Sequence, residues 1–140
     1  MHIELDSDTL FTAIKTVAHA VVNSPTTPIL ENVLLRVSNE KMVVAANNLE
    51  MAIEYTIDTD IVVKDPGDIT ISYRFLASYL NLLDPTRLTI KTDTGNTLHF
   101  TANKTKVRPK GLGAFEFPRI PTSRRDTRFV IASDVLKRAF

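Results

Sequence analysis

The feature that most constrains this 140-residue chain is an internal repeat. Each copy is a short strand with alternating apolar residues, a polar junction and an amphipathic helix. Aligned without gaps, the three copies match at five positions: Ile3, Leu5, Ser7, Leu10 and Ile14; Ile69, Ile71, Tyr73, Leu76 and Leu80; Phe129, Ile131, Ser133, Leu136 and Phe140. The sequence therefore predicts a duplicated unit followed by the opening of a third.

Strand-like segments with a period of two follow each of the first two helices. After the first helix these segments are 28–38, 41–47 and 51–59, and after the second they are 87–93, 97–103 and 104–110. The second helix is expected to end at Asp84-Pro85, because proline disfavours helical geometry in the residue before it. Each unit is then β-α-β-β-β. Two units predict an α+β fold in which two helices cover one side of antiparallel sheets, with about eight strands.

Both predicted helices have distinct inner and outer faces. The inward positions are Leu10, Ile14, Val17, Ala18 and Val21 in the first helix and Leu76, Tyr79, Leu80 and Leu83 in the second. The outward positions are Asp8, Thr12, Lys15 and His19 in the first helix and Arg74, Ser78 and Asn81 in the second. Ser7 or Asp8 is placed to cap the first helix. The outward faces are polar and weakly positive.

Composition excludes several classes of protein. A content of 44% hydrophobic and 24% charged residues is typical of a folded globular domain rather than a disordered chain. The absence of cysteine excludes a disulfide scaffold, a thiol nucleophile and a zinc knuckle. No apolar run is long enough for a membrane span, and the first residues do not resemble a signal peptide. We expect a cytoplasmic protein with no membrane contact.

Charge is unevenly distributed along the chain. The net charge is only +1, but residues 104–138 hold ten basic and three acidic side chains, against seven basic and thirteen acidic in the remainder. Such a basic end is typical of a surface that faces an anion or an acidic partner, and equally of a solvated loop and linker.

Few side chains suggest catalysis. His2, His19 and His99 are far apart in the sequence, and no serine lies in a nucleophile elbow. Glu50 and Glu54 are four residues apart, which on one strand places both carboxylates on the same face. A small enzyme using Glu50, Glu54 and His99 is one hypothesis, although solvated carboxylates explain the spacing better. No catalytic residue, metal site or cofactor is predicted.

The segment around residue 111 carries glycines and aromatic residues. Gly111-Leu112-Gly113 lacks the later glycine and the following apolar helix of a phosphate-binding loop. Phe115 and Phe117 could stack on nucleic-acid bases, as aromatic side chains do in proteins that bind single strands. The neighbouring Pro118, Ile120 and Pro121 favour a different role, in which both phenylalanines are buried and anchor the loop.

Three segments carry a resemblance to a known family. They are TPILENVLLRV at 27–37, NLEMAIE at 48–54, and KVRPKGLGAFEFPRIP at 106–121. Their order and spacing resemble those of the bacterial sliding clamps, the beta subunit of DNA polymerase III, with Asn48 at a position where aspartate is usual. The resemblance covers residues 1–140.

The resemblance implies an architecture and a function. A clamp subunit has three similar domains of two βαβββ units each, and two subunits close head to tail into a ring around duplex DNA. Residues 1–122 would be the N-terminal domain, 123–127 a linker, and 128–140 the first strand and partial helix of a truncated second domain. The expected function is a DNA replication processivity factor, a non-catalytic subunit that tethers DNA polymerase III to its template. The peptide pocket for polymerase and clamp loader would belong to domains that this segment lacks.

The resemblance also implies residues that face DNA. A ring that slides needs a polar, mildly positive channel that attracts phosphates without gripping them. The outward residues Lys15, His19 and Arg74 fit this role. Ser24 and Tyr73 occupy two positions at which the family often has a basic residue, so this chain departs from the family there.

A second implied surface is the contact with another subunit. The second helix, with Arg74 and Ser78, and the strand from Lys104 to Arg108 would face the third domain of a partner subunit in a head-to-tail homodimer. Lys104 and Lys106 would meet acidic side chains, and Val107 an apolar patch. A solvated edge strand protected by lysines is the alternative.

Besides the enzyme hypothesis, the sequence alone leaves open one alternative to a clamp subunit. The chain has the features of a stand-alone clamp-like domain that binds or inhibits an intact clamp through its basic edge.

Overall fold

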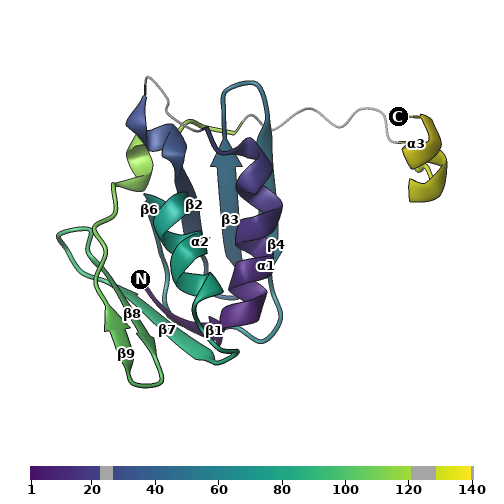
Figure 1. The fold of residues 1–140 in the computed structure, drawn as a ribbon. Coiled ribbons are helices and arrows are strands. Elements are labelled where there is room, and N and C mark those ends of the chain that lie inside the picture. Colours follow the sequence, from purple (N-terminus) through teal and green to yellow (C-terminus); the bar gives the residue numbers. More distant parts are fainter. Residues whose placement is uncertain (23–26, 121–128, 140) are drawn as a thin grey trace.

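A computed structural model describes residues 1–22, 27–120 and 129–139 (Figure 1). Its strands are β1 (His2–Asp6), β2 (Asn32–Val37), β3 (Met42–Asn47), β4 (Ala52–Ile57), β5 (Val62–Asp65), β6 (Gly67–Ser72), β7 (Arg87–Thr92), β8 (Leu98–Ala102) and β9 (Thr105–Val107). Its helices are α1 (Ser7–Val17), α2 (Tyr73–Asn81) and α3 (Ser133–Ala139), with short 3₁₀ helices η1 (Ala18–Ala20), η2 (Pro28–Glu31) and η3 (Ala114–Glu116).

The strands form two antiparallel sheets in which the two repeats exchange their first strands. Sheet A has the order β5-β1-β7-β8-β9, and sheet B has the order β4-β3-β2-β6. Strand β1 of the first repeat pairs with β7 of the second, while β6 of the second repeat pairs with β2 of the first. Each sheet therefore contains strands from both repeats.

The predicted α+β fold with two βαβββ repeats is confirmed, and several details differ, two of them in the strands. Strand β5 was not predicted; it connects the repeats and pairs with the free edge of β1. The predicted strand 28–38 starts only at Asn32, because residues 28–31 form η2. Proline lacks the N–H that a strand ladder needs and suits the first turn of a helix, so Pro28 favours this outcome.

Helices α1 and α2 lie side by side and cover the inner faces of the sheets (Figure 1). Their apolar positions join one core with the inward residues of both sheets. The largest side chains that are fully buried are Phe100, Ile3, Leu5, Leu10, Ile14, Leu35, Met42, Ile69, Ile71, Leu76, Leu88 and Ile90. The 3.6-residue period of the helices and the two-residue period of the strands therefore meet in a single apolar interior.

The start of α1 differs from the prediction. Asp6 is the N-cap residue, and no side chain caps the helix. Ser7 is buried instead, and its hydroxyl oxygen accepts a hydrogen bond from the Thr86 backbone N–H at 3.1 Å, while the Ser7 N–H donates to the Thr86 carbonyl at 2.9 Å. This reciprocal pair joins the start of α1 to the residue before β7.

The loop after β9 covers the outer face of sheet B. Phe117 is buried there against Ile29, Leu30 and Leu34, as expected for a loop anchor. Phe115 is 89% exposed, so the same expectation is wrong for this residue. It lies in η3, on the solvent side of the segment that Phe117 fixes.

The last described segment is exposed throughout. Residues 129–132 belong to no strand, in contrast to the prediction, whereas α3 forms where the third copy predicts a helix. A strand needs a hydrogen-bonding neighbour, and neither sheet receives this segment. The predicted linker 123–127 lies outside the described residues. Within the described residues, the helices are too short or too polar to cross a membrane.

Candidate nucleic-acid and subunit interfaces

The helical face, formed by the solvent side of α1, η1 and α2, holds most of the predicted DNA-facing residues. Lys15 on α1, His19 on η1 and Arg74 on α2 are all exposed, as their helical spacing predicts. The Lys15 ammonium lies 4.0 Å from the centre of the Phe11 ring, and this cation–π contact orients the side chain. Ser24 lies outside the described residues.

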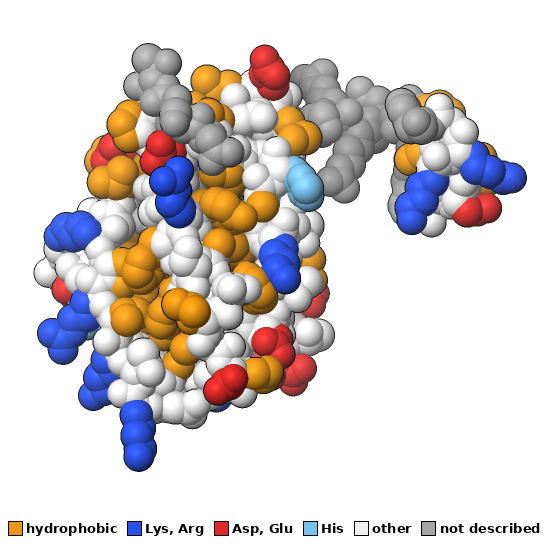
Figure 2. All heavy atoms as spheres, viewed as in Figure 1, with side chains coloured by type: hydrophobic (Ala, Val, Ile, Leu, Met, Phe, Trp, Pro, Cys, Tyr) orange, Lys and Arg blue, Asp and Glu red, His pale blue; other side chains and the backbone are white. Residues whose placement is uncertain are grey.

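The charge of the helical face is modest and unopposed. Figure 2 shows separate basic side chains among uncharged and apolar surface, with acidic side chains near the upper and lower ends of the domain. Among the described residues, no ion pair involves Lys15, His19 or Arg74. The three side chains are therefore available to an external anion.

A small cleft lies at the start of α2. Val21, Val22, Glu31, Ser72, Tyr73 and Arg74 line it, and it encloses about 110 Å³. The Ser72 hydroxyl caps α2 by accepting the Phe75 N–H at 3.4 Å. Tyr73 is half-buried and packs against the core, so it contributes shape rather than charge to this cleft. Arg74 is the cationic residue of the cleft.

The predicted subunit edge is formed by α2 and β9. Arg74 and Ser78 are exposed on α2, Lys106 is exposed on β9, and Lys104 lies in the turn before that strand. Val107 is half-buried beside Phe100, its partner in β8. Because β9 is the last strand of sheet A, its outer edge has no strand neighbour among the described residues.

An aromatic cluster joins α2 to sheet A. The Phe75 and Tyr79 rings stack with centroids 6.1 Å apart, and the Tyr79 ring meets Phe100 edge-on at 5.5 Å. The Tyr79 hydroxyl is buried without a hydrogen-bond partner among the described residues, and burial raises the pKa of this phenol. The cluster fixes α2 on β8, the strand next to the edge strand β9.

Two features of this region were not predicted from the sequence. Leu82, just after α2, is 84% exposed and extends the row of Arg74 and Ser78 at intervals of four residues. That spacing is visible in the sequence and identifies the position.

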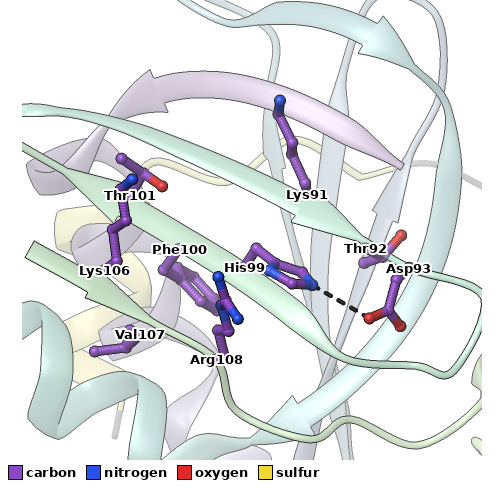
Figure 3. Close-up of a pocket in the computed structure, with 9 residues that line it drawn as sticks. All are labelled: Lys91, Thr92, Asp93, His99, Phe100, Thr101, Lys106, Val107 and Arg108. Carbon is purple, nitrogen blue, oxygen red and sulfur yellow. Dashed lines mark hydrogen bonds and ion pairs between the residues drawn. The ribbon is translucent and has the colours of Figure 1, made fainter.

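The second missed feature is an open hollow of about 400 Å³ on the outer face of sheet A. Lys91, Thr92, Asp93, His99, Phe100, Thr101, Lys106, Val107 and Arg108 line it (Figure 3). It lies on three consecutive strands, β7, β8 and β9, whose register places these residues side by side.

Asp93, just after β7, and His99, on β8, form the acidic corner of this hollow. The Asp93 carboxylate accepts hydrogen bonds from the Thr97 and Gly95 backbone N–H groups, each at 2.9 Å, and lies 3.2 Å from the His99 ring (Figure 3). Hydrogen bonding lowers the pKa of Asp93 to about 2; the Thr97 N–H has the largest effect and the His99 ring the next largest. The carboxylate is therefore ionised at neutral pH and already committed to the turn.

The structure separates the residues of the enzyme hypothesis. Glu54 lies on β4 of sheet B, and Glu50 lies in the turn before that strand rather than on its face. His99 lies on β8 of sheet A and pairs with Asp93, not with either glutamate. Within the described residues, no three histidine or acidic side chains gather as a metal site would require.

Comparison with known proteins agrees with this geometry. Two intertwined βαβββ repeats with both helices on one side define a sliding-clamp type of domain. The family model described as "DNA polymerase III beta subunit, N-terminal domain" matches residues 1–121. The chain therefore belongs to this family.

Individual relatives are distant in sequence but close in fold. The beta sliding clamp of Chlamydia muridarum is 28% identical over 131 residues, which cover 91% of this chain and 34% of the relative. That of Streptococcus pneumoniae serotype 4 is 23% identical over 143 residues, covering 99% of this chain and 38% of the relative. The crystal structure of the Bacillus subtilis sliding clamp superposes with a TM-score of 0.95 at 22% identity, over 99% of this chain and 38% of that one. The chain thus spans well under half the length of these relatives.

Proposed function

We propose that this chain supplies the N-terminal domain of a non-catalytic processivity clamp that surrounds duplex DNA during replication. The observation that carries the proposal is the placement of α1 and α2 side by side, with Lys15, His19 and Arg74 exposed and, among the described residues, outside any ion pair. Such a surface attracts phosphates but offers few contacts, which suits a protein that slides. The domain would occupy residues 1–122, with 123–127 as a linker to a further clamp domain that starts within 128–140.

The α2–β9 edge is the proposed contact with a second clamp subunit. Lys104, Lys106 and Arg74 supply positive charge, while Val107 and the exposed Leu82 supply apolar area. An acidic partner surface would complement this edge. Closure into a ring, contact with DNA polymerase III and a clamp loader, and a cytoplasmic location belong to the proposed whole protein.

Measurement of duplex binding tests the helical face directly, and weak binding is expected. The 140-residue chain should bind a mixed-sequence DNA duplex measurably only at low salt, in fluorescence anisotropy and in amide NMR shifts of α1 and α2. Replacing both basic residues, Lys15→Gln with Arg74→Gln, should remove the shifts on these helices. It should also lower the slope of log affinity against log salt by about 0.9 for each phosphate that the variant no longer binds.

A matched control uses one basic residue on β2 of sheet B and one just before β3. Arg36 and Lys41 are exposed and, among the described residues, belong to no ion pair. The double variant Arg36→Gln with Lys41→Gln changes the net charge equally and should leave the α1 and α2 shifts in place. Tight, salt-resistant or sequence-selective binding by the wild-type chain would contradict a sliding role.

A further inference from the structure

The hollow on sheet A brings together basic side chains from three consecutive strands. Lys91 comes from β7, His99 from β8, Lys106 from β9 and Arg108 from the residue that follows β9. Lys91 lies directly opposite His99, and Lys106 lies directly opposite Thr101. Side chains that face each other across antiparallel strands lie on the same side of the sheet. These groups therefore share one outward face.

The positive charge of the hollow is largely uncompensated. Lys91, Lys106 and Arg108 belong to none of the ion pairs found among the described residues, and Asp93 is the single acid in the lining. The Asp93 carboxylate is held by two backbone N–H groups and His99. An incoming anion would meet three free cations and one carboxylate that is already bonded.

The cations lie over the sheet rather than beyond its edge. In Figure 3, Lys106 extends toward Thr101 and Arg108 extends toward His99, both across β8. Lys106 and Val107 belong to the proposed subunit edge as well as to the hollow, whereas Lys104 of that edge does not line the hollow. A ligand that contacts Lys106 and Arg108 here would rest on the face of sheet A, away from the position of an added strand.

The donor set matches a phosphate group. An arginine, two lysines, a histidine and the Thr101 hydroxyl can all donate hydrogen bonds to oxygen. A phosphodiester oxyanion suits the planar guanidinium and point-charge lysines, which are the usual phosphate-binding residues. The hollow is open to solvent, whereas a small-molecule site buries most of its ligand. A polymer with repeated phosphates therefore fits better than a free metabolite.

We propose that the hollow on the outer face of sheet A is a second, sequence-independent contact for the phosphate backbone of duplex DNA. It is separate from the helical face and does not rest on the proposed ring. Duplex is favoured over single strands because the aromatic side chain of the lining, Phe100, is fully buried and cannot stack on bases. DNA that passes near the outside of the protein would be held here by charge alone.

The test combines two variants of the full 140-residue chain. Amide NMR shifts and anisotropy are measured with a mixed-sequence duplex at low salt. The wild-type chain should show shifts at Thr101, Lys106 and Arg108. The double variant Lys106→Gln with Arg108→Gln should lose these shifts, weaken binding by about threefold or more and lower the salt slope by about 0.9 for each phosphate that it no longer binds. The sheet B control, Arg36→Gln with Lys41→Gln, should keep the shifts.

Three results would overturn the proposal. The first is a duplex titration that leaves the amides of the hollow unchanged. The second is saturation of the hollow by inorganic phosphate at the same concentration of phosphate groups, which would identify a small-anion site. The third is binding of a polyglutamate peptide without binding of the duplex, which would identify an acidic protein as the partner. The helical variants Lys15→Gln and Arg74→Gln should leave the shifts of the hollow intact, so either proposal can fail without the other.

Discussion

The helical face and the hollow of sheet A both present positive charge, but the fold builds them in different ways. On the helical face, each exposed cation occupies a position set by the 3.6-residue period of its own helix, as Lys15 and Arg74 show. In the hollow, the neighbours Lys91 and His99 are set by the register between β7 and β8. A helix thus encodes its surface locally, whereas a sheet surface depends on which strands pair.

The two regions also differ in how their charges are held. The cations of the helical face have no acidic partners among the described residues, while the hollow contains the His99–Asp93 pair and an ordered turn. Phe100 lies between the regions, because it lines the hollow and also contacts Phe75 and Tyr79. Substitutions can therefore be ordered by whether they affect both regions, the link between them, or one region alone.

The largest effect is expected for Phe100→Ala. This side chain is fully buried, and its removal abolishes the aromatic packing that holds α2 on sheet A. The free energy of unfolding should fall by about 3–5 kcal/mol, as for other buried Phe→Ala changes, and binding at both regions should fail together. Urea denaturation followed by circular dichroism measures the destabilisation.

Phe115→Ala is the matched control for this change. The same side chain is removed from a position that is 89% exposed, so stability should change by less than about 0.5 kcal/mol. Equal destabilisation by the two variants would show that Phe100 does not link the regions as the structure indicates.

A smaller destabilisation is expected for Ser7→Ala. The Ser7 hydroxyl is the acceptor for the Thr86 N–H at 3.1 Å, in a part-buried position between α1 and β7. Removing it leaves that donor without its partner, which costs about 1–3 kcal/mol. Chemical denaturation should show this decrease, and hydrogen exchange at Thr86 should become faster.

Thr12→Ala controls for the removal of a hydroxyl. The Thr12 hydroxyl donates to the Asp8 carbonyl on the exposed side of α1, where water can replace it. Alanine also has the higher helix propensity, so the variant should be as stable as the wild-type chain or slightly more stable. If Thr12→Ala destabilised the chain more than Ser7→Ala, the hydrogen bond between Ser7 and Thr86 would not stabilise the fold as expected.

Much of the fold could be predicted from the sequence because its information is local and repeated. The alternation at Ile69 and Ile71 and the helical spacing of Leu76 and Leu80 were sufficient to predict a strand followed by a helix. The exchange of first strands between repeats and the addition of β5 depend on long-range pairing, which no local period contains. Ser7 illustrates the same limit, because its residue type favours a cap while tertiary packing gives it a different partner.

The candidate surfaces divide in the same way. Exposure of Lys15, His19 and Arg74 follows from helix periodicity, and the structure confirms it. The roles assigned to these residues, and those assigned to Lys104, Lys106 and Val107, came from family resemblance and stay predictions. The hollow was not predicted, since Lys91, His99 and Arg108 become neighbours only when β7, β8 and β9 are aligned.

The smallest effect, confined to the hollow, is expected for Asp93→Asn and depends on pH. Hydrogen bonds from Thr97, His99 and Gly95 lower the pKa of the folded-state carboxyl from 3.8 to about 2. A depressed folded-state pKa means that the ionised form stabilises the fold above the unfolded-state pKa. This contribution is lost as the pH falls from about 4 to about 2. The wild-type chain should therefore melt above the variant at neutral pH, and the difference should shrink across that acid range.

Asp84→Asn is the matched control, because it removes a carboxylate that is not held by a turn. Among the described residues, the Asp84 carboxylate takes part in no ion pair, and no side-chain hydrogen bond found there involves it. Its substitution should leave the pH dependence of melting unchanged. If Asp93→Asn instead kept the wild-type profile between about pH 4 and about pH 2, the pKa of Asp93 would be the same in the folded and unfolded chains. The hydrogen bonds from Thr97, Gly95 and His99 would then not favour the ionised carboxylate, and the acidic corner of the hollow would not be held as the structure indicates.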